Sequence, residues 1–364
     1  MTIILFIIIL AILILVHEFG HFIVAKKTGM RVDEFGLGFP PRLFAFKKGE
    51  TEYSINAIPL GGFVKIFGED PDDESISGKD SKRSMVNKPK WAQAITISAG
   101  VVFNIIFAWI LISIGFMVGL PTPVAEFEEG VVKEVNVVIV GVLEESPAFE
   151  SGLKVGDKLL FLGAENESVQ NFSPEEMVSF ISSHGEKEIS ILYKRGELEP
   201  AFTSVIPTND ILKNQSAIGI TVEEIGIAKF GIFKSFWEGL KTTLGLISAI
   251  AVGLAIFVYQ LITGTASFSQ VAGPVGIVGM VGDAAQFGFI YLLSFTAFIS
   301  INLAVINSIP FPALDGGRFL FILIETIMRK NIKPVIANTL NLIGFVLLIG
   351  LMVAVTYNDV LKLF

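Results

Sequence analysis

The sequence predicts a polytopic α-helical membrane protein that carries a membrane-associated β-hairpin and one small extracytoplasmic α+β domain. Hydrophobic residues make up 52% of the 364 residues, and the mean hydropathy of +0.68 exceeds that of an ordinary soluble protein. Several apolar segments reach the roughly 20 residues that a helix needs to span a bilayer. The connections between these segments differ sharply in charge, which indicates that they lie on opposite sides of a membrane.

Four segments are expected to cross the membrane as helices. The first could pass for a signal peptide, but it has no positively charged side chain at its start and it contains two histidines, so we expect it to be retained. The four segments are residues 2–25, 92–120, 287–309 and about 335–355.

Charge predicts the orientation of these helices. Between Lys26 and Lys90 there are 12 basic and 10 acidic residues, whereas between Pro121 and Gly239 there are 9 basic and 20 acidic ones. The positive-inside rule then places the first connection in the cytoplasm and the acidic domain outside. If the further apolar stretch 244–262 also crossed, the basic connection near residues 318–333 would lie outside. We therefore expect 244–262 to lie at, or dip into, the outer interface.

The connections contain strand and turn signals. Glycines and prolines in residues 35–68 indicate short strands and turns close to the membrane. The acidic domain has several β-rich runs and one helix, for which Ser173 is the expected N-cap and Pro174 the first residue. His184, in the polar stretch SSHGEKE, is expected to be a solvated loop residue. The absence of cysteine excludes disulfides and thiolate metal sites.

The stretch ILVHEFGHFIVAK places ionisable groups inside the first apolar segment, where they are costly and usually functional. His17 and His21 are four residues apart, so both imidazoles can reach one metal ion from one face of a helix. Glu18 lies next to that face and can act as a general base. Zinc suits such a pair of imidazoles. A chance match is the alternative, but two of the three histidines in the chain form this motif.

A catalytic zinc normally has three protein ligands. The third apolar span ends in INLAVINSIPFPALDGGRF, where Asp315 is the only acid and is flanked by prolines and glycines. Irregular backbone at membrane depth is tolerated where it is buried in protein or lines a cavity. A capping aspartate at the start of the next helix is the alternative, and the need for a third ligand favours Asp315 as that ligand.

Polar amides occur within two of the apolar segments. Asn302 and Asn307 precede Asp315 and either bind the substrate and the oxyanion formed during its hydrolysis or join neighbouring helices. Gly100 and Asn104, four residues apart in the second span, are interpreted as structural, allowing close helix packing with one added hydrogen bond.

Taken together, HEFGH, SAGVVFN and NLAVINSIPFPALDGG resemble the site-2 proteases, the intramembrane zinc metalloproteases, and among them the RseP-like members. The resemblance covers nearly the whole chain in the same order. It implies a zinc cofactor held by three ligands, a catalytic glutamate and two substrate-positioning asparagines. Those residues are His17, His21 and Asp315 for zinc, Glu18 for catalysis, and Asn302 and Asn307 for the substrate.

The stretch EESPAFESGLKVGDKLLFLG is similar to the core of a bacterial PDZ domain. One such copy is expected, whereas RseP proper is expected to have two, and single-copy members exist in the family. A steric guard without a peptide ligand is the alternative for this domain. Residues 50–67 resemble the membrane-associated β-hairpin of the family. The expected organisation is 1–120 for the first membrane part, 125–212 for the PDZ-like domain, 228–284 for an interfacial helix and loop, and 285–364 for the last two spans.

The resemblance implies regulated intramembrane proteolysis in a bacterial cytoplasmic membrane. Expected substrates are single-span proteins already trimmed outside, such as anti-sigma factors, other membrane regulators or signal-peptide remnants, and no nucleic-acid partner is expected. Three rival functions are a metal transporter, an inactive adaptor, and an HExxH protease of another family. The first would need further polar residues along the helices, the second has no chemical need for Glu18 and Asp315, and the third would take Glu325 as its ligand.

Overall fold

The computed structural model divides the chain into two compact units, and each is described by itself. The first, called the membrane unit, comprises Met1–Ile112, Gly239–Gly282 and Phe295–Phe364. The second, called the β-rich unit, comprises Ser113–Glu238 and Asp283–Ser294. The structure describes residues 1–70, 72–128, 130–165, 167–212, 215–265 and 271–361.

Within the described residues, five helices are long and apolar enough to cross a membrane, judged by length and composition. Each of the four expected segments is found as one of them, and the fifth contains the 244–262 stretch. The five are α1 (Thr2–Lys27), α3 (Lys90–Val118), α6 (Ile232–Thr263), α8 (Phe289–Ser308) and α10 (Pro334–Leu361). The shorter helices of the chain are α2 (Asp73–Ser77), α4 (Pro147–Glu150), α5 (Pro174–Ser183), α7 (Pro274–Phe287) and α9 (Asp315–Met328).

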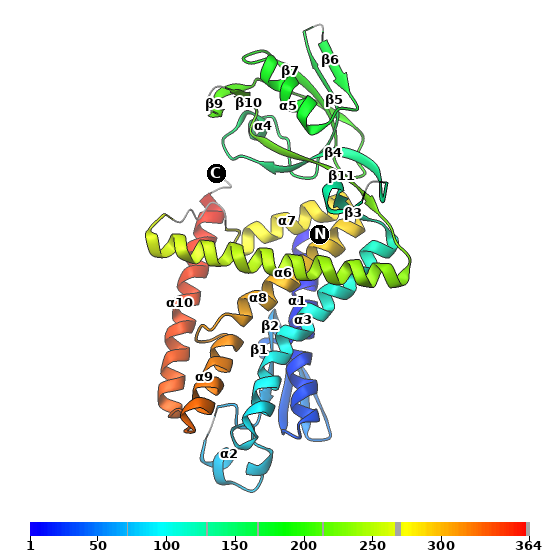
Figure 1. The fold of residues 1–364 in the computed structure, drawn as a ribbon. Helices are drawn as coiled ribbons and strands as arrows, with labels where there is room; N and C mark the ends of the chain where they lie inside the picture. The colour runs from blue at the N-terminus through cyan, green and yellow to red at the C-terminus, as the bar shows by residue number, and fades with distance from the viewer. Residues whose placement is uncertain (71, 129, 166, 213–214, 266–270, 362–364) are drawn as a thin grey trace. The chain divides into compact units, whose positions relative to one another are not determined.

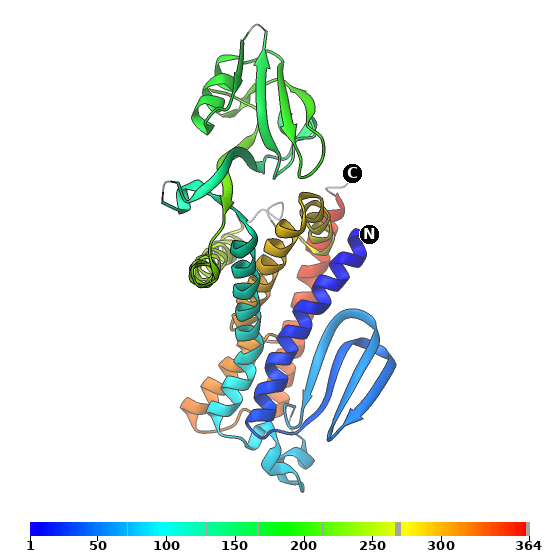
Figure 2. The ribbon, with the colours of Figure 1, turned by 90° about the vertical axis from the view of Figure 1, so that its right-hand side faces the viewer.

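Helix α6 differs from the other long helices in direction. In the membrane unit, α1, α3 and α10 run in roughly the same direction, whereas the part of α6 that belongs to this unit runs across them (Figures 1 and 2). None of its most apolar 18-residue window is buried by protein. Length and composition alone allow α6 to span, so its place at the interface stays a prediction.

The hairpin of the membrane unit folds back on itself. Strands β1 (Val32–Lys48) and β2 (Thr51–Ile66) are joined by a tight turn. Residues 34–37 of β1 pair on both sides, with residues 62–65 and with residues 52–55 of β2. The resulting curled sheet lies beside α1 (Figure 2). The strands cover most of the stretch 35–68 in which the sequence indicated them, and the hairpin begins well before residue 50, the start expected from the family resemblance.

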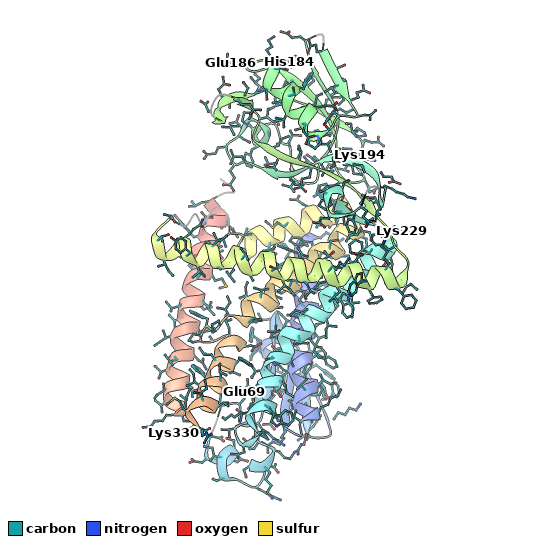
Figure 3. The ribbon with its side chains drawn as sticks, viewed as in Figure 1. Glu69, His184, Glu186, Lys194, Lys229 and Lys330 are labelled. Atoms are coloured by element: carbon teal, nitrogen blue, oxygen red, sulfur yellow. The ribbon has the colours of Figure 1, made fainter. Side chains whose placement is uncertain are left out.

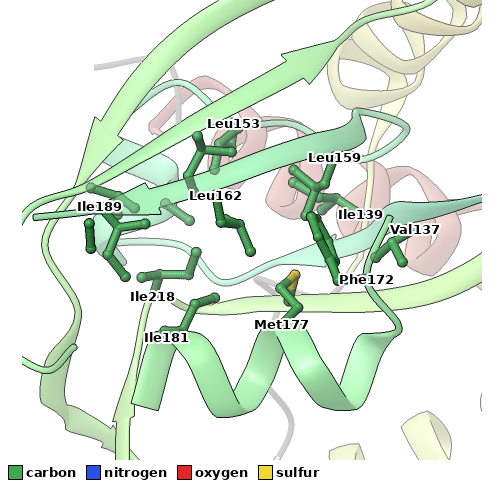
Figure 4. Packing of buried hydrophobic residues seen from close by; sticks show 14 residues of the cluster. Val137, Ile139, Leu153, Leu159, Leu162, Phe172, Met177, Ile181, Ile189 and Ile218 are labelled. Atoms are coloured by element: carbon green, nitrogen blue, oxygen red, sulfur yellow. The ribbon is translucent and has the colours of Figure 1, made fainter. Parts of the chain in front are cut away.

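The β-rich unit contains a sheet with the strand order β3-β11-β4-β5-β7-β8, and β6 is also paired with β5. Helix α5 covers this sheet, and Met177 and Ile181 on the helix face Leu162 and Ile189 on the strands (Figure 4). The strands are β3 (Leu120–Pro123), β4 (Val132–Val142), β5 (Lys158–Ala164), β6 (Glu167–Gln170), β7 (Ile189–Lys194), β8 (Ala201–Val205) and β11 (Ile220–Ala228), and a separate hairpin is formed by β9 (Thr208–Leu212) and β10 (Gln215–Ala217).

Two local predictions have opposite outcomes here. The helix start at Ser173 is confirmed: its hydroxyl accepts from the Glu176 N–H, and the Glu176 carboxylate accepts from the Ser173 N–H. The prediction for His184 is wrong. Its side chain, labelled in Figure 3, is 6% exposed, stacks on Phe180 and bonds to the Phe180 carbonyl. The sheet also continues to Ala228, past the expected limit at residue 212, because β11 pairs with β4.

Candidate metal centre in the membrane unit

The two histidines of HEFGH face the same point. Helix α1 is continuous from Thr2 to Lys27, so residues 17 and 21 lie one turn apart on one face. The Nε2 atoms of His17 and His21 are 3.2 Å apart. His21 is buried and His17 is half-buried, and among their neighbours only Leu15 and Phe19 are exposed.

Asp315 brings a carboxylate to the same point. Its Oδ2 lies 3.1 Å from His17 Nε2 and 3.3 Å from His21 Nε2. Asp315 is the first residue of α9, and the N-cap position belongs to Leu314, so the alternative of a capping aspartate is wrong. The two glycines that follow are necessary because a Cβ atom at Gly316 or Gly317 would overlap the backbone carbonyl of Ile309 or Phe311.

These three side chains fit a metal ion. Tetrahedral zinc with ligands at about 2.0–2.1 Å would separate its ligand atoms by roughly 3.3 Å, which is close to the three distances observed. Asp315 Oδ2 is buried and forms no hydrogen bond in the described part of the chain, despite its nearness to two nitrogens. A buried acceptor without a donor is costly, and a cation removes that cost. Among the described residues, this is the group of histidines and carboxylates that can hold a metal.

The other nitrogen of each imidazole contacts α3. His21 Nδ1 lies 2.8 Å from the backbone carbonyl of Thr96, and His17 Nδ1 lies 3.3 Å from the side-chain nitrogen of Asn104. Such partners hold an imidazole in place for metal binding. No pattern in the sequence points to Thr96, because every residue has a backbone carbonyl.

Glu18 is adjacent to the cluster and is covered by the hairpin. Gly62 of β2 lies so close that an added Cβ would be 3.4 Å from Glu18 Cγ and 2.9 Å from Ile14 Cγ2. The Glu18 side chain is half-buried at this position. The proximity of β2 to Glu18 was not predicted, since it depends on how the hairpin curls rather than on any local pattern.

Comparison with known proteins agrees with this geometry. The family model of peptidase family M50 matches residues 5–351. The chain belongs to peptidase family M50. It is 36% identical to a candidate zinc metalloprotease of Clostridium perfringens, over 96% of this chain and 95% of that protein. It is 30% identical to the regulator of sigma-W protease RasP of Bacillus subtilis and 29% identical to the zinc metalloprotease RasP of Bacillus licheniformis, each over 100% of this chain and 99% of the relative.

Family membership confirms the predicted resemblance to the site-2 proteases and the predicted enzyme class, a metalloendopeptidase. Together with the long apolar helices, it identifies this M50 peptidase as a multi-pass membrane protein.

The two asparagines of α8 contribute no atom to the cluster of this M50 peptidase. The Asn302 side chain donates to the Phe298 carbonyl of its own helix, at 2.9 Å. Asn307 is half-buried further along α8. Their predicted roles toward the substrate remain predictions.

Glu325, the ligand that a different HExxH protease would use, is engaged elsewhere. Its Oε2 accepts from Lys90 Nζ at 2.6 Å, and its Oε1 accepts from the Ile332 N–H at 2.8 Å. It joins the start of α3 to α9, and the structure gives Asp315 the position beside the histidines of the M50 peptidase.

Proposed function

We propose that this protein is a zinc-dependent intramembrane endopeptidase that cleaves transmembrane segments of single-span membrane proteins. The observation that carries the proposal is the convergence of His17, His21 and Asp315 on one point, with Glu18 one residue away. Zinc is the metal in the names of its relatives, and the set of two imidazoles and one carboxylate is typical of catalytic zinc. His17, His21 and Asp315 are the ligands in this proposal.

The chain's own residues supply the proton transfers. Bound zinc acts as a Lewis acid that polarises the scissile carbonyl and makes water more acidic. Glu18 takes a proton from the attacking water and returns it to the leaving amine, as a general base and then a general acid. Asn302 and Asn307 hold the substrate backbone and the oxyanion by donating hydrogen bonds. For Asn302 this requires its amide to leave the Phe298 carbonyl.

The hairpin provides a way to present the substrate. A transmembrane helix has all of its backbone groups bonded internally, so it must be opened locally before a peptide bond can be hydrolysed. Residues 62–65 of β2 pair with β1 on one edge, and Gly62 among them lies beside Glu18. An unwound substrate can add to this sheet as a strand, which is a common mode of peptide recognition.

The β-rich unit is assigned as a PDZ-like domain that limits which proteins reach the membrane unit. It has a groove of about 520 Å³ between the end of β4 and α5, lined by Val142, Leu143, Met177 and Ile181 among others. A groove between a strand and a helix suits an extended peptide. Exclusion of untrimmed proteins by size, without any peptide ligand, is the alternative role for the unit.

The proposed location is a bacterial cytoplasmic membrane, with the β-rich unit outside and the hairpin on the cytoplasmic side. The basic connection after α1 and the acidic β-rich unit support this orientation. Four spans, with α6 at the outer interface, agree with the crosswise direction of α6 in the membrane unit. Anti-sigma factors, other membrane regulators and signal-peptide remnants are the proposed substrates, and the name of the Bacillus subtilis relative favours the first.

Zinc content and cleavage measured together test this function. Wild type, Glu18→Gln and Asp315→Ala are purified in detergent and assayed against single-span proteins with truncated outer domains. We expect one zinc per chain and cleavage in the wild type, zinc without cleavage in Glu18→Gln, and neither in Asp315→Ala. Full cleavage by Glu18→Gln, or a wild type that binds no zinc, would contradict the proposal.

A further inference from the structure

Helix α3 provides each imidazole of HEFGH with one partner on the side away from the metal centre. His21 Nδ1 contacts the Thr96 carbonyl at 2.8 Å, and His17 Nδ1 contacts the Asn104 amide at 3.3 Å. Thr96 and Asn104 are eight residues apart, just over two turns of α3, and each faces one of the two histidines. The two contacts are thus equivalent in position but not in chemistry.

The contact to His21 has only one possible direction. A backbone carbonyl accepts hydrogen bonds and cannot donate them. His21 Nδ1 therefore carries the proton, and the lone pair lies on Nε2, which faces Asp315 at 3.3 Å. This is the form of a neutral histidine that binds a metal through Nε2.

The contact to His17 has two possible directions, because one end of an amide donates and the other accepts. With the Asn104 nitrogen toward His17, His17 Nδ1 would have to accept, and the proton would sit on Nε2, where it blocks metal binding. In this orientation the Asn104 oxygen is buried and has no hydrogen-bond partner in the described part of the chain. Asn104 is fully buried, so water does not solvate that oxygen.

A half-turn of the Asn104 amide exchanges its oxygen and its nitrogen. This changes both the direction of the hydrogen bond to His17 and the partner of the oxygen. The oxygen then accepts a proton from His17 Nδ1, and the lone pair of His17 moves to Nε2, beside Asp315 Oδ2 at 3.1 Å. The oxygen that lacked a partner acquires a donor, and the amide nitrogen takes its former buried position. Both histidines then present the same nitrogen, in the same form, to the same point.

We propose that Asn104 is a positioning residue of the metal centre: its side-chain oxygen accepts a hydrogen bond from His17 Nδ1 and fixes His17 in the form that binds zinc through Nε2. This extends the role expected from the sequence, which was helix packing. The inference rests on the proposed zinc site. A contact with α8 holds the backbone of Asn104 in place. The Ser300 hydroxyl donates to the backbone carbonyl oxygen of Asn104 at 2.9 Å, and both residues are fully buried.

The test compares Asn104→Asp with Asn104→Leu. An aspartate has nearly the shape of asparagine and offers only acceptors when ionised, whereas leucine offers neither donor nor acceptor. The dissociation constant for zinc is measured in detergent by competition with a chelator. We expect Asn104→Asp to bind zinc within about threefold of wild type and Asn104→Leu to bind it about 10- to 100-fold more weakly, the usual effect of losing such a partner.

Two results would overturn the inference. Equal weakening in Asn104→Asp and Asn104→Leu would show that the amide nitrogen, not the oxygen, is needed. Wild-type affinity in both variants would show that Asn104 only packs. Asn104→Ala is measured alongside because leucine can disturb a buried site, and thermal unfolding of the zinc-free proteins separates misfolding from weaker binding. A wild type without zinc would instead refute the proposed function.

Discussion

Gly100 of α3 lies directly against the metal-binding edge of His21. A Cβ atom at Gly100 would overlap His21 Nε2 and would stand 2.7 Å from Cε1 and 2.8 Å from Nε2 of His17. The glycine therefore leaves the space that the two imidazoles occupy. The sequence predicted that Gly100 allows two helices to approach closely. In the structure this close approach brings α3 against the two histidines of the candidate metal centre.

Gly100→Ala is expected to lower proteolytic activity by about a hundredfold or more, because displacement of catalytic groups by about 1 Å can cost that much. Zinc binding should weaken in parallel. Peptide cleavage and zinc content are measured on the purified variant.

Gly350→Ala on α10 is the matched control, since a Cβ atom there meets nothing within 4 Å. Alanine is also a better helix former than glycine. Unchanged activity in Gly350→Ala together with unchanged activity in Gly100→Ala would contradict the steric role of Gly100.

The two acids of α9 should differ in their effect on zinc. Asp315→Ala removes an oxygen that lies 3.1 Å and 3.3 Å from the two histidine nitrogens. We expect zinc affinity to fall by more than about a hundredfold, which is the upper range for losing a partner that only orients a ligand. Glu325→Ala should keep one zinc per chain, because Glu325 binds Lys90 and the Ile332 N–H instead. Metal analysis after dialysis distinguishes the two. Loss of zinc in Glu325→Ala alone would favour a different ligand set.

The stability of the hairpin is expected to depend on pH through Glu50. Its carboxylate binds Arg83 through two hydrogen bonds of 2.6 and 2.7 Å and Lys26 through one of 2.5 Å. The Arg83 guanidinium, followed by the Lys26 ammonium, lowers the pKa of Glu50 from 4.5 to about 2. The ionised form is favoured in the folded protein, so the stabilisation is complete above pH 4.5 and is lost as the pH falls toward 2.

Thermal unfolding of wild type and Glu50→Gln between about pH 7 and about pH 3 checks this dependence. We expect the wild type to be more stable at neutral pH by no more than about 1 kcal/mol, because Arg83 is 42% exposed and solvent screens the pair. The difference should shrink as the pH falls below 4.5. A difference that stays constant over the whole range would show that Glu50 contributes packing rather than charge.

Residue type and spacing were sufficient to predict the three side chains, His17, His21 and Asp315, that the structure brings together. His17 and His21 have a spacing that only a helix converts into a shared face, and Asp315 is the one acid among breakers at the end of an apolar span. Each prediction depended on the need for an imidazole or carboxylate ligand, which few residues at membrane depth in this sequence could supply. The long helices were predicted for a similar reason, since an uninterrupted apolar stretch of that length is typical of a helix in a bilayer.

Features that depend on tertiary packing were not predictable in this way. The Thr96 carbonyl is a backbone group, which leaves no mark on the sequence. His184 lies in a polar stretch, yet it is buried because Phe180, one turn earlier, offers both a ring and a carbonyl. The double pairing of residues 34–37 depends on the curl of the whole hairpin.

Asp359, near the C-terminal end of α10, makes a contact with the start of α7 that we expect to be stabilising. Its carboxylate is buried and accepts from the N–H groups of Gly273 and Gly276, at 3.1 and 2.9 Å. These two glycines are at the start of α7, where unbonded N–H groups and the helix dipole favour a negative charge. Neither glycine has room for a side chain on this face, because an added Cβ would approach the carboxylate of Asp359.

Asp359→Ala is expected to lower the free energy of unfolding by at least about 3 kcal/mol, since the two hydrogen bonds to this charged group are each worth about 1.5–3 kcal/mol and a smaller helix-capping loss accompanies them. Denaturation in detergent, followed by circular dichroism, measures the change. Thr356→Val on the same helix is the control, because its hydroxyl bonds to the Met352 carbonyl one turn away on α10 itself and the residue is only half-buried. Equal loss of stability in both variants would mean that α10 is sensitive along its length, and that the pairing of Asp359 with α7 has no special role.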